Sequence, residues 1–509
     1  MEATTFGIFF SLLLAITLLA KRQRHRFPPG PRGYPVIGSV LQMPMQNAWL
    51  TYQRWGRDYG SDIIYLNVLG KHIYILNSAN AVYDLLEKRS ATYSDRVVTT
   101  MAHELVKWDK NFALLPYGDF WREHRKAFHR QFQPDMVPKY HSHMYKQARG
   151  LLGRLLAQPN ALRKHLRLMA GATILGVCYG IDAQSENDHY LQIIEQAVHS
   201  LNEVAKPGAY LVDFLPILKY LPTWMPGTQF KRDAATWRPQ VDLMFDEPFD
   251  VVKQSLDDGT AVDSVCASLL SEMDERKDKR YQETVIKQAV ETAYIGGADT
   301  TVSALSTFVL AMVLNPEVQR TAQKHVDSVT GGDRLPTIED RDSLPYITAI
   351  IKEALRWRPV LPLAVPHIST TDDEYRGYHI PAGSIIMGNA WAVLHDGSRY
   401  PNPDSFDPTR FLTLAGELDR DAPDALEAAF GFGRRICAGM HFALDSMWIN
   451  AAYVFATLDI AKPVEDGRVI EPSGEYTTGL LEQPLPFKIS VAPRSKIAEG
   501  LIRQREHGD

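Results

Sequence analysis

The stretch Phe430-Gly431-Phe432-Gly433-Arg434-Arg435-Ile436-Cys437-Ala438-Gly439 holds the most informative pattern of the chain. It places one cysteine, Cys437, directly after a glycine-rich turn with two arginines, and a helix-like run begins at Gly439. The N-terminus of a helix and the N–H groups of the turn would favour the thiolate and lower the pKa of the thiol. The same groups would tune a metal bound to the sulfur. The pattern therefore indicates a metal-ligating thiolate; the alternative is an inert, buried cysteine in a glycine-rich loop.

The spacing of this loop, Phe-x-x-Gly-x-Arg-x-Cys-x-Gly, resembles the haem-binding loop of the cytochromes P-450, the haem-thiolate monooxygenases. The resemblance implies that Cys437 is the axial iron ligand of haem b (iron protoporphyrin IX) and pushes electron density toward the iron to favour O–O cleavage. It also implies a mainly α fold, helix-rich with a minor β-rich lobe, preceded by a single N-terminal transmembrane helix. The cofactor-binding residues expected in the loop are Phe430, Gly433, Arg435, Cys437 and Gly439.

Composition excludes several other classes of protein. The 509 residues carry a net charge of −5, from 55 basic and 60 acidic residues, and nothing marks a nucleic-acid binder. Three cysteines cannot form a disulfide framework or a cysteine-only zinc site, and Cys178 and Cys266 lie in mostly apolar runs typical of a core. Length alone would suggest two or three domains. From about residue 50 onward, however, the composition is even, and the resemblance implies one haem-thiolate catalytic domain over residues 51–495.

The N-terminus has the pattern of a membrane anchor. Residues 4–20 are uncharged and strongly apolar, and a helix of that length would extend about 26 Å, near the short limit for a membrane span. A cleaved signal peptide is the alternative, but its positive charge would precede the apolar run. We expect an anchor and basic stop over residues 1–26, in the endoplasmic reticulum membrane, with the catalytic domain in the cytosol. The basic residues of the stop are Lys21, Arg22, Arg24 and Arg26.

The segments flanking the catalytic domain have distinct patterns. Phe27-Pro28-Pro29-Gly30-Pro31 opens a proline-rich stretch over residues 27–50, which predicts a stiff hinge after the anchor; a proline-rich partner motif is the alternative. Residues 496–509 read as a polar tail that we expect to be frayed. Residues 214–227 are apolar, aromatic and interrupted by prolines, which is typical either of a lid that dips into the bilayer face or of a buried connector.

Most of the catalytic domain has helical periodicity, with a long helix predicted over about 284–314. No second apolar run is expected to be long and uninterrupted enough to span a membrane. Short strands are predicted at 63–68, 73–76, 378–380, 384–387 and 487–491.

Gly296-Gly297-Ala298-Asp299-Thr300-Thr301 is unusual inside the predicted long helix. Two glycines there cost about 1 kcal/mol each against alanine, but they allow another group to approach the backbone. An acid followed by threonine can order water and pass protons. The motif resembles the oxygen-binding groove of the family, which implies that the catalytic residues Asp299 and Thr300 deliver the protons needed for O–O cleavage. The alternative is a kinked helix with a capping Asp-Thr pair.

Glu353 and Arg356 share one face of a predicted helix because they are three residues apart. Without other motifs a solvated surface pair is the simpler interpretation. The resemblance implies instead that Arg410, in Phe406–Phe411, joins them in a buried ion network that supports the core and does no chemistry.

Two carboxylates of a haem, its propionates, need cationic or N–H donors. Trp121 and Arg125 lie four residues apart and point the same way on a helix, and with His367 and Arg435 they match the propionate contacts of the family. A solvent-facing basic helix is the alternative for 121–125. Residues 361–366 cannot be helical, and in the family this segment lines the pocket. Residues 99–106 and 479–481 are weaker pocket candidates.

The function that the resemblance implies is insertion of one oxygen atom of O2 into a lipophilic small molecule. No Gly-x-Gly-x-x-Gly follows a predicted strand, so electrons must come from another protein. The resemblance implies NADPH–cytochrome P-450 reductase, with cytochrome b5 as a second candidate donor. Lys126, Arg130 and Arg434 would dock such a partner or are ordinary surface charge. An apolar pocket favours a lipophilic substrate, and the sequence resembles fungal members that act on secondary metabolites such as terpenoids or polyketides.

Two other functions remain open at this stage. A haem-thiolate isomerase or dehydratase would need no electrons, and the Asp299-Thr300 pair would have no proton transfer to perform. A non-catalytic haem-binding protein would need neither an apolar pocket nor that pair. NADPH-dependent turnover with a reductase would distinguish a monooxygenase from the isomerase or dehydratase. A ligand-induced spin-state change without turnover would support the non-catalytic protein.

Overall fold

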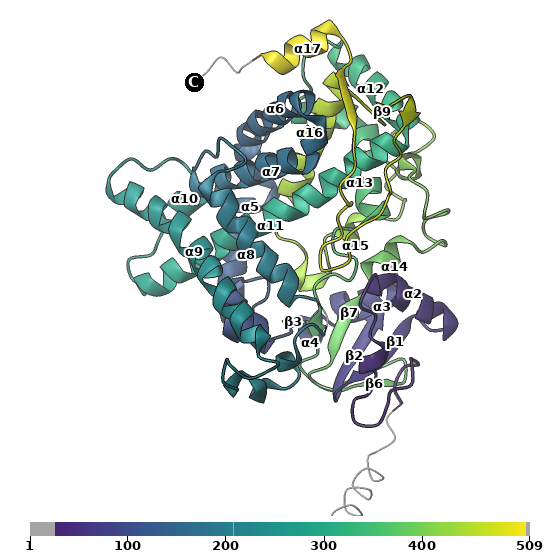
Figure 1. Cartoon of the computed structure of the whole chain (residues 1–509). Helices are drawn as coiled ribbons and strands as arrows, with labels where there is room; N and C mark the ends of the chain where they lie inside the picture. The colour runs from purple at the N-terminus through teal and green to yellow at the C-terminus, as the bar shows by residue number, and fades with distance from the viewer. Residues whose placement is uncertain (1–25, 207, 505–509) are drawn as a thin grey trace, which may run out of the picture.

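The computed structural model describes residues 26–206 and 208–504. It is mainly α-helical with small sheets, as the sequence predicts (Figure 1). Helices form the larger lobe, and β1, β2 and β7 lie with α2 and α3 at one end of the molecule. The predicted membrane anchor falls on residues 1–25, which lie outside the described residues.

The elements have the following bounds. The longer helices are α2 (Ala48–Asp58), α5 (Asp119–Phe132), α6 (His141–Ala157), α7 (Leu162–Tyr179), α8 (His189–Val204), α9 (Gln229–Asp257), α11 (Lys279–Leu314), α12 (Pro316–Thr330), α13 (Pro345–Trp357) and α16 (Met440–Thr457). The shorter helices are α3 (Ala79–Val82), α4 (Ser90–Tyr93), α10 (Val265–Ser271), α14 (Ala390–Leu394), α15 (Leu426–Ala429) and α17 (Lys496–Arg503). The strands are β1 (Ile63–Val68), β2 (Lys71–Leu76), β3 (Asp95–Arg96), β4 (His367–Ile368), β5 (Asp373–Tyr375), β6 (Tyr378–Ile380), β7 (Ile385–Gly388), β8 (Leu458–Ala461), β9 (Val464–Glu465), β10 (Arg468–Val469) and β11 (Ser490–Pro493).

The largest sheet joins segments that are far apart in the sequence. Its strand order is β1-β2-β7-β4-β3, with β2 and β7 parallel and the other neighbours antiparallel. In the register of β3 and β4, Arg96 is directly opposite His367. The sheet therefore brings two basic residues together at its edge, beside the helical lobe.

The predicted strands agree with the observed ones within a few residues. β1 and β6 have the predicted bounds, β2 begins earlier at Lys71, and β7 is shifted by one residue. The last predicted strand, 487–491, corresponds to β11, which begins at Ser490 and pairs with β8. These shifts are small because pairing partners, which the sequence does not show, decide where a ladder begins and ends.

Helix α11 is the central helix of the larger lobe. It packs against α5, α7, α13 and α16, and most of its side chains from Val285 onward are buried. Its apolar part is long enough to cross a membrane, which corrects the expectation that no second run of that kind exists. Because 78% of that apolar window is buried inside the protein, α11 has the character of a core helix.

The proline-rich segment predicted as a hinge lies against strand β1. The N–H of Tyr65 donates to the carbonyl of Pro29 at 3.0 Å, and Phe27 stacks on the Tyr65 ring. A Cβ on Gly30 would stand 2.0 Å from the Tyr65 carbonyl oxygen, so only glycine allows this approach.

The end of the described chain corrects the expectation of a frayed polar tail. Residues 496–503 form α17, in which Ala498, Leu501 and Ile502 are buried against α6 and α16. The sequence reads as polar because the apolar residues of this short helix occupy one face only.

The segment 214–227 lies on the surface, which excludes the buried connector. It contains a 3₁₀ turn over Pro216–Tyr220, and Ile217, Tyr220 and Trp224 are 73%, 76% and 79% exposed. Phe214 packs against the β1–β2 lobe, so the segment lies at the same end of the molecule as the sheet. Large apolar side chains this exposed mark a contact surface.

Candidate functional site

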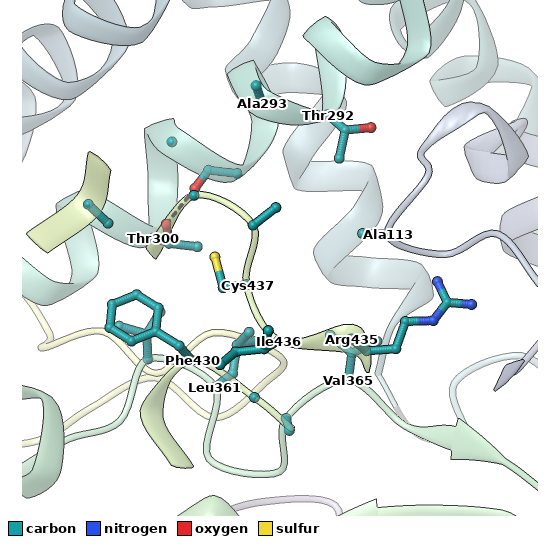
Figure 2. A pocket seen from close by; sticks show the side chains of 18 of the residues that line it. Ala113, Thr292, Ala293, Thr300, Leu361, Val365, Phe430, Arg435, Ile436 and Cys437 are labelled. Atoms are coloured by element: carbon teal, nitrogen blue, oxygen red, sulfur yellow. Dashed lines mark hydrogen bonds between the residues drawn. The ribbon is translucent and has the colours of Figure 1, made fainter. Parts of the chain in front are cut away.

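A largely apolar cavity lies between α11, α5, the Cys437 loop and the segment 360–367. Figure 2 shows the Cys437 sulfur pointing into it from the loop, while α11 carries Thr292, Ala293 and Thr300 on the other side. Cys437 is exposed only in the sense that its sulfur faces this internal space; the surrounding protein encloses it. No Asp or Glu is among the described residues that line the cavity. The loop residues that line the cavity are Phe430, Gly431, Phe432, Arg435, Ile436, Cys437, Ala438 and Gly439.

The local geometry of the loop explains its glycines. Gly433 has φ +56°, and a Cβ there would lie 2.0 Å from the carbonyl oxygen of Leu86, so no side chain fits. Gly433 does not itself line the cavity, and its observed role is to let the loop pack on the backbone of residues 86–87. The N–H of Cys437 donates to the carbonyl of Phe430 at 2.8 Å, which closes the turn just before α16 begins at Met440.

The pKa of the Cys437 thiol is raised, mainly by burial, although a hydrogen bond from the Gly439 N–H and the charge of Arg125 both act to lower it. The expectation of a lowered pKa is therefore wrong for the free thiol. The Gly439 N–H and Arg125 do act in the expected direction, because both stabilise the thiolate that would bind a metal. A thiol that coordinates a metal is deprotonated by the metal itself.

Three arginines line the cavity: Arg96 and Arg435 are buried, and Arg125 is partly buried. Arg435 donates to the carbonyls of Ser94 and Leu115, both at 2.8 Å, and Arg125 donates to the carbonyl of Ile436 at 2.8 Å. Arg96 donates to the carbonyls of Ala113, Val365 and Pro366. Burial lowers the pKa of each of the three, that of Arg435 to about 10. Asp95 offsets part of the charge of Arg96 and Arg435, and a concentration of buried positive charge this high favours a further anion beside it.

The cavity fits the two carboxylates of haem b. Nη1 of Arg435 is buried and has no hydrogen-bond partner among residues 26–206 and 208–504, so one strong donor is left for a ligand. Trp121 and His367 line the same part of the cavity, and Trp121 lies under the Arg435 guanidinium at 4.3 Å. Nδ1 of His367 donates to the carbonyl of Tyr93 at 2.7 Å. Burial lowers the pKa of His367 and favours the neutral ring, so a second donation, from Nε2, requires an anion beside it that favours the protonated ring.

Sequence reasoning did not identify Arg96. It belongs to no motif of the loop or of α5, and it reaches the cavity because β3 pairs with β4 opposite His367. The signal that could have revealed it is an arginine in a short apolar strand-like context, where a charge needs a partner.

The six-residue motif on α11 divides between two faces of the helix. Gly296 faces the cavity, where a Cβ would meet no atom within 4 Å, whereas a Cβ on Gly297 would lie 2.8 Å from Cγ1 of Ile174 on α7. Thr300 lines the cavity, and its hydroxyl donates to the Gly296 carbonyl one turn earlier. The first glycine therefore leaves space for a ligand, and the second lets two helices approach.

Asp299 does not line the cavity. It is on the face of α11 toward α7, where its carboxylate lies 4.0 Å from Nε of Arg167. Burial raises the pKa of Asp299, while Arg167 and Arg163 oppose that rise. Arg167 also pairs with Glu195, whose side chain is exposed. The acid and the threonine are thus neighbours in sequence that face different surroundings about 100° apart around the helix.

The structure brings Glu353, Arg356 and Arg410 together. The Glu353 carboxylate accepts two hydrogen bonds from Arg356, at 2.7 and 2.9 Å, and lies 3.1 Å from Nε of Arg410. It also accepts from the N–H of Asp407 at 2.8 Å, and both Glu353 and Arg356 are fully buried. A bidentate pair with further partners on every side satisfies its buried charges.

The remaining sequence candidates are placed as follows. Leu361, Ala364 and Val365 line the cavity, as expected for 361–366, and Val360 joins them. Residues 99–106 and 479–481 do not line it. Of the basic residues considered for docking, Arg130 pairs with Glu272, Arg434 donates to the Tyr117 hydroxyl, and Lys126 is exposed.

Comparison with known proteins finds a family model and relatives that cover nearly the whole chain. Residues 28–491 match the family model for cytochrome P-450. Cytochrome P-450 monooxygenase 98 of Postia placenta is 43% identical over 501 residues, which is 98% of this chain and 96% of the relative. Cytochrome P-450 monooxygenase ple1 of Rhodocybe pseudopiperita is 42% identical, over 95% of this chain and 92% of the relative. Tryptamine 4-monooxygenase of Psilocybe cyanescens is 41% identical, over 93% of this chain and 94% of the relative.

Proposed function

The chain belongs to the cytochrome P-450 family, and we propose that it inserts one oxygen atom of O2 into a lipophilic small molecule with electrons delivered from NADPH by a separate reductase. Membership makes it a monooxygenase, an oxidoreductase that incorporates molecular oxygen. In this family haem b is held by a cysteine thiolate, and Cys437 is the cysteine that faces the cavity.

One observation carries the proposal. Cys437 and Thr300 face one cavity from opposite walls, beside a cluster of arginines in which one Arg435 donor has no partner among the described residues. We assign the carboxylates of haem b to Arg96, Arg125 and Arg435, with Trp121 and His367 as further contacts. When bound, the haem supplies activation of O2 and its insertion into a C–H bond. The protein residues bind and orient both groups, exclude water and supply protons.

Thr300 is our proposed proton donor at the cavity wall. Its hydroxyl donates to the Gly296 carbonyl, so to act it must turn from that carbonyl into the cavity, and a water that donates to its oxygen replaces the proton it gives up. Asp299 serves as the source of protons behind it, because burial raises the pKa of its carboxyl, although the neighbouring Arg167 acts to lower it. In this scheme protons reach Asp299 from the α7 side and pass to Thr300 through water.

The walls support an uncharged substrate. Phe112, Ala113, Ile174, Val360 and Leu361 line the cavity above the proposed haem site, and its described lining contains no carboxylate. An ammonium group would have no counter-charge there. The related tryptamine 4-monooxygenase acts, by its name, on an amine, and for this chain we favour a neutral molecule such as a terpenoid or polyketide secondary metabolite.

The membrane location is part of the same proposal. We place the catalytic domain on the cytosolic face of the endoplasmic reticulum, anchored by residues 1–26. The exposed apolar side chains of Val36, Leu41 and Met45 and of the 217–224 segment support contact with a lipid surface. NADPH–cytochrome P-450 reductase, with cytochrome b5 as a further donor, would dock at the Cys437 side, where Lys126 and Arg434 present positive charge.

The decisive experiment is co-expression of the full chain with an NADPH–cytochrome P-450 reductase, fed with neutral terpenes, aromatic polyketides and tryptamine. We expect a product one oxygen atom heavier from a neutral substrate, formed only when NADPH and reductase are present. Turnover of a lipid hydroperoxide without NADPH would contradict the proposal in favour of an isomerase or dehydratase. The control is Cys437→Ser, which should lose both the far-red-shifted carbon monoxide band and the product.

A further inference from the structure

A tight turn lies directly behind the cavity wall, at residues 477–483. Its backbone closes through the Thr477 N–H, which donates to the Gln483 carbonyl at 2.8 Å. The Thr477 hydroxyl donates to the Leu481 carbonyl and accepts from the Gln483 N–H, both at 3.0 Å. These bonds make the turn a rigid unit that can transmit a displacement to whatever it contacts.

The turn is bonded to two walls of the cavity at one residue. The Glu482 N–H donates to the carbonyl of Val360, which lines the cavity, at 2.9 Å. The Glu482 carbonyl accepts from the hydroxyl of Ser303 on α11, which lies between the lining residues Thr301 and Ala304. The position of Glu482 therefore sets the spacing between α11 and the segment that begins at Val360.

The side chain of Glu482 is held by a single cation. It is 2% exposed, and Nη1 of Arg358 donates to its Oε1 at 3.2 Å. Its Oε2, like Nε of Arg358, has no hydrogen-bond partner within the described part of the chain. The Arg358 guanidinium lies over three aromatic rings, those of Trp357, Trp391 and Tyr476, the last at 4.5 Å.

Stability alone does not explain the buried ion pair of Glu482 and Arg358. A buried ion pair loses more hydration than it recovers unless its remaining donors and acceptors are satisfied, and here two of them are not. The nearby pair Glu353 and Arg356 differs, because both carboxylate oxygens of Glu353 accept hydrogen bonds. An apolar pair of similar volume would fill the space behind the wall at lower cost, so a positional role accounts for the charges better.

We propose that Glu482 is a positioning residue for the substrate: held by Arg358, it sets the distance between the α11 wall and the 360–361 wall and thereby determines which substrate carbon faces the reactive centre. This rests on the proposed function. Arg163, which donates to the Gln483 side chain at 2.7 Å, adds a third fixed point on α7. Burial raises the pKa of Glu482 to about 7, which shows how weakly its charge is compensated.

The test uses the full-length holoenzyme with Glu482→Gln, Glu482→Ala and the double variant Glu482→Leu/Arg358→Met. The matched control is Glu291→Gln, which alters another buried carboxyl that touches α11 and α7 but not the turn. All variants should retain the far-red-shifted carbon monoxide band. We expect the ratio of product regioisomers to change by about threefold or more in each Glu482 variant and not in the control. The double variant should recover thermal stability without recovering the product ratio.

A second readout does not depend on turnover. The spectral dissociation constants of 4-phenylimidazole and of the bulkier clotrimazole report on the wall spacing, and their ratio should change severalfold in Glu482→Ala and remain unchanged in Glu291→Gln. Unchanged azole and product ratios in the Glu482 variants would overturn the positioning role, even if the enzyme is active. A changed azole ratio supports the positioning role even if no substrate is turned over. The azole measurement therefore distinguishes failure of the positioning role from failure of the proposed function. Should Glu482→Ala not fold, Glu482→Gln carries both measurements.

Discussion

Arg435 occupies the cavity with two of its nitrogens committed to backbone carbonyls and Nη1 without a described partner. Its spacing before Cys437 made it a candidate in the sequence, but only the structure shows that the donor is unused. For Thr300, too, only the structure shows the hydrogen bonding: its hydroxyl donates to the Gly296 carbonyl. The sequence therefore identifies site residues well where they lie close together in one motif.

Replacing Arg435 should weaken haem retention. Arg435→Leu removes a charge-assisted donor, a bond worth about 1.5–3 kcal/mol, so we expect haem affinity to fall by roughly tenfold or more. Arg435→Lys should retain part of it. The measurement is the rate of haem transfer to apomyoglobin, with the surface variant Arg130→Leu as control. Equal transfer rates in Arg435→Leu and wild type would refute the assignment.

Replacing Thr300 should separate NADPH oxidation from product formation. Thr300→Ala removes the hydroxyl that we assign to proton delivery, and we expect product per NADPH to fall on the order of tenfold while hydrogen peroxide rises. Thr300→Ser keeps the hydroxyl and should remain close to wild type. Product and peroxide are quantified in the same reaction, and unchanged coupling in the alanine variant would count against the relay.

Two features of single residues are seen only in the structure. Asp299 follows the glycines in sequence, yet it faces Arg167 because successive residues on a helix point in different directions. Arg96 contacts the cavity through strand pairing with a residue 271 positions later (367 − 96). Neither orientation nor long-range pairing can be deduced from one sequence.

Helix α11 is joined to α7 by a buried hydrogen bond from the Tyr179 hydroxyl to the carboxyl group of Glu291. The other Glu291 oxygen has no partner among the described residues. Burial raises the pKa of Glu291 from 4.5 to about 8, against the hydrogen bond from Tyr179, which lowers it. The carboxyl is therefore neutral in the folded protein at pH 7 and charged in the unfolded chain.

This difference gives a sign for the pH dependence of stability. Between pH 4.5 and about 8 the folded state binds more protons at Glu291 than the unfolded state, so its contribution to the free energy of unfolding falls as pH rises. Glu291→Gln cannot titrate and should flatten the dependence, gaining on wild type toward pH 8. Thermal unfolding from pH 5 to 8.5 measures it, with Asp327→Asn as a control at a partly exposed pair. Parallel curves for Glu291→Gln and wild type would contradict it.

Helices and strands differ in how well the sequence predicted them. The long helix predicted over 284–314 is α11, because its apolar periodicity and length are decisive by themselves. The predicted strands have the right places but shifted ends, since β2 and β7 depend on each other for pairing. α17 was missed because one narrow apolar face on a short helix gives a weak pattern.

At the scale of the whole molecule, exposed apolar side chains gather near the sheet end, in the segments 36–45 and 217–224. The sequence predicts a single helix-rich catalytic unit over residues 51–495, and the family model matches residues 28–491. The sequence could not predict the sheet order or the docking of residues 27–31 on β1, because both depend on contacts between distant segments.

The 214–227 segment should be shielded by a bilayer. We expect peptides covering it to exchange amide hydrogens more slowly when the full chain is in phospholipid nanodiscs than in dilute detergent. Exposed Val464 and Val469, on β9 and β10 at the opposite end of the molecule, provide the internal control and should not change (Figure 1). Replacing Ile217 and Trp224 by serine should abolish the difference. Equal exchange in both environments would argue against a lipid contact.

The cavity wall extends from Arg96 to Met447 along the chain, and the parallel pairing of β2 with β7 joins the first and last thirds of the catalytic unit. A nascent polypeptide still on the ribosome can bury some helices early, but it lacks the cysteine loop and α16 until translation is almost complete. We therefore expect porphyrin capture to come late in synthesis, so that the nearly complete apoprotein must survive with an open, charged hollow at its centre. Supply of haem at that moment would then decide how much chain matures and how much is degraded.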